Sequence, residues 1–244
     1  MNTPRDPAIA TMPRGGFDAS WLDRRLQTDC AEYTDRDDVP DERKQKVITA
    51  LDVLGQRMNQ HAELAQIALG VVAGVDNPRI LELGAGHGRL TEHVVAAHPT
   101  VTVTVSDLDA TSVARIGDGA VGQHPRVTPR VLDATAIDEP DDTFDLVVFA
   151  QAFHHLPPAL AYAAIAEATR VGRKFLVLDL KRQAPLALLL GPMLMPALAL
   201  LWTPWSTVPA AVHDGLISGL RAYSRSALTT LGTAVDPQMN VEFL

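Results

Sequence analysis

Cysteine is almost absent from this 244-residue sequence, and its absence excludes two kinds of stabilising link. Cys30 is the only cysteine, so the chain forms neither an intrachain disulfide nor a cysteine-ligated zinc site. The first 17 residues also lack the basic head and the apolar run of a secretory signal. We therefore expect a cytoplasmic protein without a bound metal.

Positive charge is also in short supply. Lys and Arg number 21 against 29 Asp and Glu, which gives a formal net charge of −8. Binding to a nucleic-acid backbone requires a basic surface, and no dense Lys/Arg run occurs, so we expect no nucleic-acid partner. Hydrophobic residues at 47% and charged residues at 20% are typical of a globular protein, and the length suffices for one α/β domain.

Charge of either sign is missing from Gln183 to His213. The core of this segment, residues 184–205, is long enough to span a membrane, but four prolines interrupt it. Two other interpretations stay open: packing in the core or at a homodimer interface, and an apolar lid over a substrate pocket. We favour the lid, which would touch a membrane surface peripherally and would suit a hydrophobic ligand.

The N-terminal third reads as a tail followed by helices. Residues 1–17 are rich in proline and charge, which predicts a mobile tail. Apolar residues recur at helical spacing from Ser20 to Tyr33, and again from about 40 to 72, where two consecutive helices are expected. We therefore predict an N-terminal helical extension over residues 18–75.

The central part changes to short apolar runs that alternate with helical segments, a pattern typical of a parallel sheet covered on both faces. The expected strands lie at 79–83, 101–105, 127–132, 144–150 and 175–180, and the expected helices between them at 90–97 and 158–169. These elements predict a Rossmann-like, doubly wound and mostly parallel sheet. We expect a single domain over 18–244, with a cofactor-binding core at 79–182 and an apolar lid and substrate region at 183–235.

A glycine-rich turn follows the first expected strand. Its residues are Glu82-Leu83-Gly84-Ala85-Gly86-His87-Gly88. Glycines allow a tight turn and a close approach of the backbone to a ligand. Dinucleotide-binding enzymes use a similar turn with the pattern G-x-G-x-x-G, but Arg89 occupies the position of the third glycine, and Glu82 would repel a pyrophosphate. An acid at this place suits a ligand that carries an ammonium group.

Carboxylates also follow the next two strands, at the edge where ligands of such sheets bind. Asp107 is suited to accept the two hydroxyls of a ribose, and Asp133 is suited to accept an adenine amino group. Each has a simpler alternative. Asp107 or Asp109 caps the following helix, and Asp133 is a solvated loop carboxylate.

Four segments together resemble, in order, the motifs of the class I S-adenosylmethionine (SAM)-dependent methyltransferase superfamily, in the small-molecule branch that includes the ubiquinone/menaquinone methyltransferases. The segments are ILELGAGHGRL, VTVSDLDATSV, VLDATAI and FDLVVFAQAFHHLP. The resemblance covers about residues 79–180. It implies a seven-stranded sheet with a final antiparallel strand. Only residues 240–244 remain as a further strand candidate, so the closing hairpin looks shortened.

The resemblance also implies which residues bind the cofactor. Glu82 and the turn would hold the methionine end of SAM, Asp107 the ribose and Leu108 one face of the adenine. The full set of cofactor-binding candidates is Glu82, Gly84, Ala85, Gly86, Gly88, Asp107, Leu108, Asp133, Ala134, Ala150 and Gln151. The product would be S-adenosylhomocysteine (SAH).

The expected activity is transfer of the SAM methyl group to an oxygen or carbon of a small, rather hydrophobic acceptor. His154 and His155 are the candidate catalytic residues, since a histidine can deprotonate a hydroxyl as the methyl group moves. Alternatively, one of them only bonds a backbone carbonyl. Two other functions stay open: an NAD(P)-dependent oxidoreductase, and a SAM-binding protein without catalysis.

Overall fold

A computed structural model describes residues 3–4, 6–36, 38–187 and 208–244. The described chain divides into two compact units. One, which we call the sheet unit, comprises residues 55–153 and 163–179. The other, the helical unit, comprises the described residues of 3–54, 154–162 and 180–244. The single domain that the sequence predicts over 18–244 stays a prediction, because two compact units can still belong to one folding domain.

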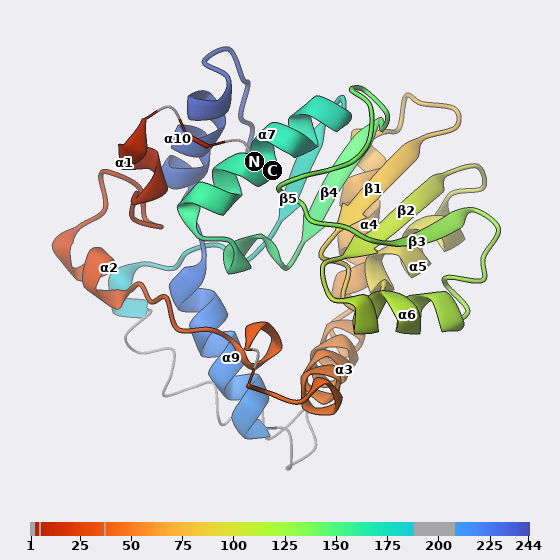
Figure 1. Cartoon of the computed structure of the whole chain (residues 1–244), viewed down its shortest axis with the longest axis horizontal. Helices are drawn as coiled ribbons and strands as arrows, with labels where there is room; N and C mark the ends of the chain where they lie inside the picture. The colour runs from red at the N-terminus through yellow and green to blue at the C-terminus, as the bar shows by residue number, and fades with distance from the viewer. Residues whose placement is uncertain (1–2, 5, 37, 188–207) are drawn as a thin grey trace. The chain divides into compact units, whose positions relative to one another are not determined.

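The sheet unit contains five parallel strands in the order β3-β2-β1-β4-β5 (Figure 1). Their bounds are Arg79–Leu83 for β1, Thr102–Asp107 for β2, Val127–Val131 for β3, Leu146–Ala150 for β4 and Phe175–Leu178 for β5. Chain order reverses on either side of β1, where Glu82 pairs with Val105 of β2 and with Val148 of β4. Sheets of this kind bind ligands beside such a reversal, at the carboxyl ends of the strands.

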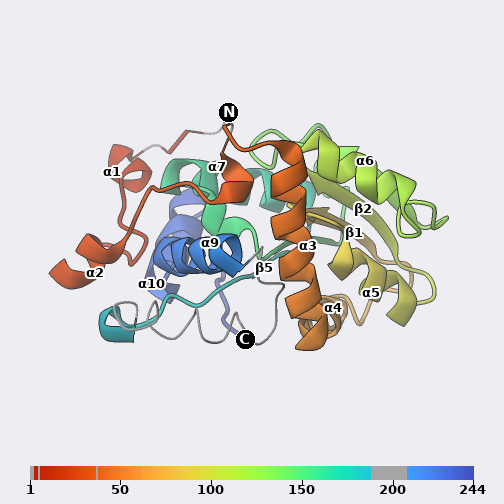
Figure 2. The same ribbon diagram turned by 90° about the horizontal axis from the view of Figure 1, so that it is seen from below.

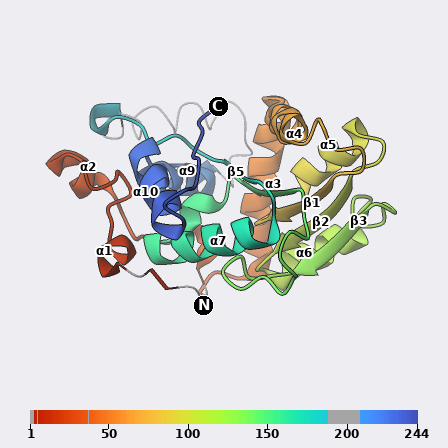
Figure 3. The same cartoon turned by 90° about the horizontal axis from the view of Figure 1, so that it is seen from above.

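Helices cover both faces of this sheet, which explains why the central strands β1 and β4 are buried along almost their whole length. Helices α4 (Gln60–Val71), α5 (Arg89–Ala97) and α6 (Ala110–Asp118) lie on one face, where their buried residues form one core. The part of α7 (Pro158–Val171) that belongs to the sheet unit lies on the other face (Figures 2 and 3). In the central strand, Ile80 and Leu81 are at most 1% exposed. The predicted doubly wound, parallel sheet is therefore confirmed.

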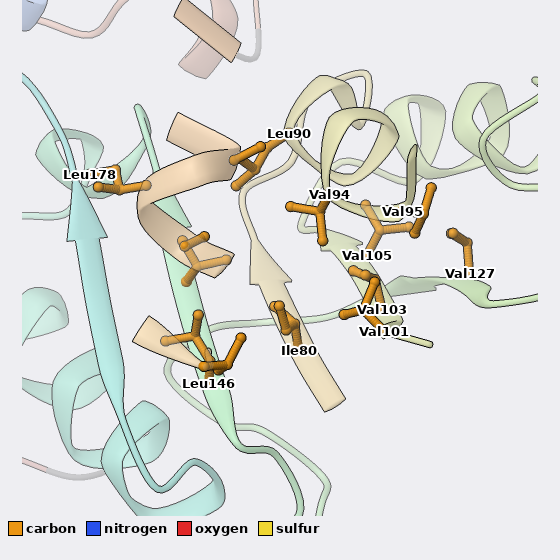
Figure 4. Packing of buried hydrophobic residues seen from close by; sticks show 14 of the residues in the cluster. Ile80, Leu90, Val94, Val95, Val101, Val103, Val105, Val127, Leu146 and Leu178 are labelled. Atoms are coloured by element: carbon orange, nitrogen blue, oxygen red, sulfur yellow. The ribbon is translucent and has the colours of Figure 1, made fainter. Parts of the chain in front are cut away.

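The core of the sheet unit lies between α5 and the strands. Figure 4 shows Leu90, Val94 and Val95 of α5 among the buried residues of this core. The other labelled members are Ile80, Val101, Val103, Val105, Val127, Leu146 and Leu178. Burial of these side chains orders the strands, and with them the loops at their carboxyl ends.

The helical unit is built from short segments that are far apart in the sequence. The elements that lie in it or begin in it are α1 (Pro7–Ala10), α2 (Trp21–Leu26), η1 (Tyr33–Asp35), α3 (Asp41–Arg57), α7 (Pro158–Val171), α9 (Val208–Arg221) and α10 (Arg225–Val235). The 3-10 turn η2 (Phe153–His155) comes directly before α7 in the chain. Arg14, Arg182 and Arg221 are buried in this unit and donate hydrogen bonds to its backbone carbonyls.

The N-terminal segment differs from the predicted mobile tail. Residues 7–10 form α1, and Met12 and Arg14 are only 2% and 4% exposed. Arg14 donates to the carbonyls of His154 and Arg221 at 2.7 and 2.6 Å. A guanidinium that satisfies two buried carbonyls orders the segment around it, which composition alone does not reveal.

Two further expectations for the N-terminal helices have opposite outcomes. The two helices expected between about 40 and 72 are confirmed as α3 and α4. The helix expected over Ser20–Tyr33 is wrong in extent, because α2 ends at Leu26 and Trp21 on its supposed apolar face is 74% exposed. Downstream of α2, Glu32 is buried and accepts a hydrogen bond from the hydroxyl of Ser218. Tertiary contacts override helical periodicity here.

The C-terminal segment forms no strand at 240–244, so the described residues contain five strands rather than the seven implied by the resemblance. Met239 and Val241 instead pack on α10, where an added Cβ at Gly232 would lie 2.9–3.0 Å from their side chains. The expected lid at 184–205 falls mostly on residues 188–207, outside the described residues. No helix in the described ranges has the length and apolar character needed to cross a membrane.

Candidate cofactor site

The predicted cofactor-binding residues stand at the carboxyl ends of four neighbouring strands of the sheet unit. The glycine turn follows β1, Asp107 ends β2, Asp133 comes two residues after β3, and Ala150 ends β4. Because the strands are parallel, their carboxyl ends share one edge of the sheet. The structure thus brings together residues that are spread over 70 positions of the sequence, from Glu82 to Gln151.

The glycine turn needs glycine for its conformation, and at one position also for space. Gly84, Gly86 and Gly88 have φ values of 64°, 55° and 72°, in the left-handed region. A Cβ on Gly84 would lie 2.8 Å from the Cβ of Ala152 and 2.9 Å from Cε1 of Phe149. The side chains of Ala152 and Phe149 therefore fill the space that a side chain at position 84 would need.

Asp107 links the end of β2 to the glycine turn. Its Oδ2 accepts the backbone N–H of Gly86 at 2.8 Å, and its Oδ1 accepts the N–H of Asp109 at 2.9 Å. The cap of α6 is Asp109, which accepts from the backbone N–H groups of Thr111 and Ser112. Asp109 is therefore the residue that caps α6, and Asp107 does not have that role. Beside it, Leu108 is 71% exposed, an apolar surface of the kind that an adenine ring would cover.

Glu82 has a role in the glycine turn that the sequence did not predict. The side chain is buried, and its carboxylate accepts a hydrogen bond from the backbone N–H of Thr91 at 3.1 Å and a short one from the Thr91 hydroxyl. Thr91 lies in the first turn of α5, whose N-cap, Gly88, has no side chain to accept that N–H. Glu82 thus holds the start of α5 against the end of β1. The glycine at the cap is the sequence signal that this helix needs an acceptor from elsewhere.

Burial raises the pKa of Glu82 to about 7, and the negative charge of Asp107 adds to the increase, while the hydrogen bonds from Thr91 oppose it. A carboxyl with this pKa binds a proton in the folded protein over a pH range in which the unfolded chain has lost it. Glu82 therefore couples the stability of the sheet unit to pH.

The sign of this coupling gives a testable prediction. The ordinary pKa of Glu82 is 4.5, so between about pH 4.5 and 7 the folded state binds more protons than the unfolded state. The Glu82 contribution to stability is therefore fully present below about pH 4.5 and declines as the pH rises through 7. We expect the Glu82→Gln variant, which cannot ionise, to lose this decline. Thermal unfolding between pH 5 and 8 measures it.

The exposed Glu63 of α4 provides the matched control for this experiment. Glu63→Gln should leave the pH dependence of the wild-type protein unchanged. If Glu82→Gln shows the same slope of stability against pH as the wild-type protein, burial of an ionisable Glu82 carboxyl is wrong.

Asp133 and Gln151 are the two remaining candidates at the sheet edge, and only for Gln151 does the backbone conformation add an argument for a functional role. The carboxylate of Asp133 accepts both the backbone N–H and the hydroxyl of Thr135, at 2.8 and 2.7 Å, in an exposed loop, so its predicted contact with adenine stays a prediction. Gln151 has a φ of 56° and donates its N–H to the carbonyl of Leu178 at 2.7 Å. Non-glycine residues in this conformation are uncommon and gather at functional sites.

The two predicted catalytic histidines belong to the helical unit, where both rings face carboxylates. His154 is 3% exposed, and its Nε2 lies 3.3 Å from Oε1 of Glu32. His155 places Nδ1 2.7 Å from Oδ1 of Asp35 and Nε2 3.6 Å from Oε2 of Glu32. We call Glu32, His154 and His155 the histidine cluster. A general-base role for either histidine stays a prediction.

The sequence did not link these histidines to their acidic partners, because about 120 residues separate them. Burial acts to raise the pKa of Asp35, but the hydrogen bonds and charges of His155 and Arg221 outweigh it and lower the pKa to about 2. The side chains around the histidine cluster thus include a carboxylate that stays ionised at neutral pH.

Sequence comparison finds a similarity to a known family over the middle of the chain. Residues 80–174 match the methyltransferase domain family. Two curated relatives from the fission yeast Schizosaccharomyces pombe, an uncharacterized methyltransferase and an uncharacterized methyltransferase-like protein, are each 37% identical over 75 residues, or 31% of this chain. The match covers 28% and 27% of their lengths. The chain thus spans less than a third of the curated relatives it matches.

Solved structures show the same fold over a longer part of the chain. The plantazolicin methyltransferase BpumL in complex with SAH is similar with a TM-score of 0.56 and 12% identity, over 81% of this chain and 72% of that one. BpumL in complex with a monoazolic desmethylPZN analog and SAH gives 0.55 and 12%, over 80% and 70%. At this identity the likeness concerns the fold alone. Residues 80–174 therefore match a methyltransferase domain, within a chain that has the Rossmann-like fold of class I methyltransferases.

Proposed function

We propose that this protein is a SAM-dependent methyltransferase that transfers the methyl group to an oxygen or carbon of a small, hydrophobic acceptor and releases SAH. The observation that carries the proposal is the arrangement at the sheet edge. The glycine turn, Asp107 and Gln151 share that edge, and all lie within the segment 80–174 that matches the methyltransferase domain family.

The residues at this edge fit the parts of SAM. The glycine turn, whose backbone has positive φ at Gly84, Gly86 and Gly88, would receive the methionine end close to the backbone. The Asp107 carboxylate would accept the ribose hydroxyls, and the exposed Leu108 would cover a face of the adenine. Glu82, buried against Thr91, would act by holding the turn in place.

SAM supplies a methyl group already activated by its sulfonium, so the protein need not form a covalent intermediate. The remaining task is to orient the acceptor and to exclude water. The segment Gln183–His213, which has no charged side chain, follows β5 in the chain and supports a hydrophobic acceptor. His154 and His155 remain our candidates for accepting the proton of a hydroxyl acceptor.

Replacement of Asp107 tests the cofactor site directly. We expect Asp107→Ala to weaken SAM binding by about 1–3 kcal/mol, roughly 5- to 150-fold, because a charged acceptor of hydrogen bonds is lost. Isothermal titration with SAM measures the change. Asp109→Ala is the matched control, since it removes a carboxylate from the same loop that caps α6, and SAM affinity should stay near that of the wild-type protein.

Equal SAM affinity in the wild-type protein and Asp107→Ala would show that the ribose is bound elsewhere. NADH and NADPH serve as comparison ligands in the same titration, and binding of either in place of SAM would favour an oxidoreductase. A panel of hydrophobic phenols, enols and amines, with detection of SAH, then tests for transfer. Saturable SAM binding without SAH from any acceptor would indicate a SAM-binding protein without catalysis.

A further inference from the structure

The histidine cluster lies wholly in the helical unit and joins two imidazoles and one carboxylate from distant parts of the chain. One ligand atom from each of Glu32, His154 and His155 lies within 4.8 Å of the others. Nε2 of His154 lies 3.3 Å from Oε1 of Glu32, and Nε2 of His155 lies 3.6 Å from Oε2 of the same carboxylate. Two ligands about 2.0–2.1 Å from a tetrahedral zinc ion lie about 3.3–3.4 Å apart, and each of these two N···O separations is close to that value.

Outer contacts orient two of these three side chains. Asp35 bonds Nδ1 of His155 at 2.7 Å, which directs Nε2 of the ring toward Glu32. Ser218 donates its hydroxyl to Oε1 of Glu32 at 2.9 Å. A carboxylate behind a histidine is the usual support of a metal-bound imidazole, because it sets which ring nitrogen faces the ion.

Hydrogen bonds from two arginines also fix the backbone at His154 and His155. Arg14 donates to the carbonyl of His154 at 2.7 Å, and Arg221 donates to the carbonyl of His155. Arg221 also pairs with Oδ2 of Asp35 at 2.6 Å, so one guanidinium connects the turn to the carboxylate behind His155. Ligand positions fixed before binding reduce the ordering that a metal ion must bring about.

Burial and charge also suit a cation. The side chains of Glu32 and His154 are each 4% exposed, whereas that of His155 is 23% exposed and leaves a route from solvent. The two imidazole rings lie 4.4 Å apart, a separation at which two protonated rings would repel each other. Neutral rings are the form that binds metals, and a divalent ion would balance the buried carboxylate.

We propose that Glu32, His154 and His155 bind a divalent first-row transition metal ion, with Zn²⁺ as its representative. Two imidazoles favour such an ion over Mg²⁺ and Ca²⁺, which prefer oxygen ligands throughout. The ion joins the segment before α3 to the turn before α7, and while it is bound the two imidazoles serve as its ligands in place of the general-base role considered above. The sequence predicted no metal, because Glu32 is more than 120 residues from the two histidines and none of the three proposed ligands is a cysteine.

Metal titration tests the site. Protein treated with EDTA and dialysed is titrated calorimetrically with ZnCl₂ and, separately, with MgCl₂. We expect saturation at one Zn²⁺ per chain and no saturable heat from Mg²⁺. Glu32→Gln and His155→Gln should each weaken Zn²⁺ binding at least about tenfold, the lower limit for changes in the surroundings of a metal site. His213→Gln, which alters a histidine that pairs with Asp214 in the same unit, should leave it unchanged.

A second measurement needs no variant and therefore does not depend on their folding. Diethylpyrocarbonate modifies accessible histidines of the wild-type protein, and mass spectrometry locates the modified residues. Zn²⁺ should protect His155, and His213, whose side chain is 33% exposed, should stay reactive. Lack of stoichiometric Zn²⁺ binding, or binding that neither protects His155 nor weakens in Glu32→Gln, would overturn the proposal and leave an internal ion-pair network.

Discussion

Gly84→Ala is expected to lower the free energy of unfolding by about 2–5 kcal/mol and to abolish measurable SAM binding. Two costs add up. Alanine in the left-handed conformation costs about 1–2 kcal/mol, and Gly84 has a φ of 64°. Overpacking costs about 1–3 kcal/mol more, because the new methyl group would lie within 3 Å of Ala152 and Phe149. Urea denaturation measures the stability, and calorimetric titration measures SAM binding.

Substitutions at two other glycines separate the conformational cost from the cost of overpacking. Gly88 also has a positive φ, but its added Cβ would meet no atom closer than 3.5 Å, so Gly88→Ala should show the conformational cost alone. Gly117 in α6 has no heavy atom within 4 Å of an added Cβ, and Gly117→Ala should stabilise the helix by up to about 1 kcal/mol. A Gly84→Ala protein as stable as the wild-type protein would show that the turn adopts another conformation.

Asp23→Ala is the second substitution with a large expected effect, a loss of about 3–5 kcal/mol of stability. Its partner Arg182 has a side chain only 2% exposed, and the two are joined by an ion pair of 2.8 Å between Nε and Oδ1. The guanidinium also donates to the carbonyls of Leu220 and Ala222. Without Asp23 the cation stays buried and loses its counter-ion, which costs more than the pair itself contributes.

A double-mutant cycle with Arg182→Met distinguishes this explanation from general damage to packing. The double variant should be less destabilised than the sum of the two single variants, since no unpaired charge remains. Glu42→Ala is the control for an exposed pair, because Glu42 and Lys46 on α3 are 80% and 64% exposed, and stability should hardly change. Additive effects of Asp23→Ala and Arg182→Met would mean that the buried ion pair does not couple them.

The structure of the sheet unit could be predicted well because its signals are local. Each strand is a run of four to six residues, and a glycine or an aspartate marks the end of β1, β2 and β5. Once the strands are parallel, the place of Gly84, Asp107 and Asp133 follows, since parallel strands bring their carboxyl ends to one edge. Helices α3 and α4 could be predicted for the same reason, because periodicity is a property of consecutive residues.

The failures concern segments whose structure depends on distant partners. Residues 240–244 have the composition of a strand, but Val241 among them packs against α10 at Gly232. Trp21 and Leu22 have helical spacing, yet α2 stops after six residues, and Glu32 beyond it turns to Ser218, 186 positions away. In each segment the structure depends on a contact with a distant residue, which the spacing of apolar residues does not reveal.

The sequence by itself determined the kind of sheet, the glycine turn and the positions of the carboxylates at the strand ends, because these depend on residues that follow one another in the chain. Only the tertiary structure decided that Asp109 rather than Asp107 caps α6, that Thr91 holds Glu82, and that Glu32 lies between two histidines. These contacts come from side chains that folding brings into the same buried space, where each polar group must find a partner. No pattern of neighbouring residues contains that information.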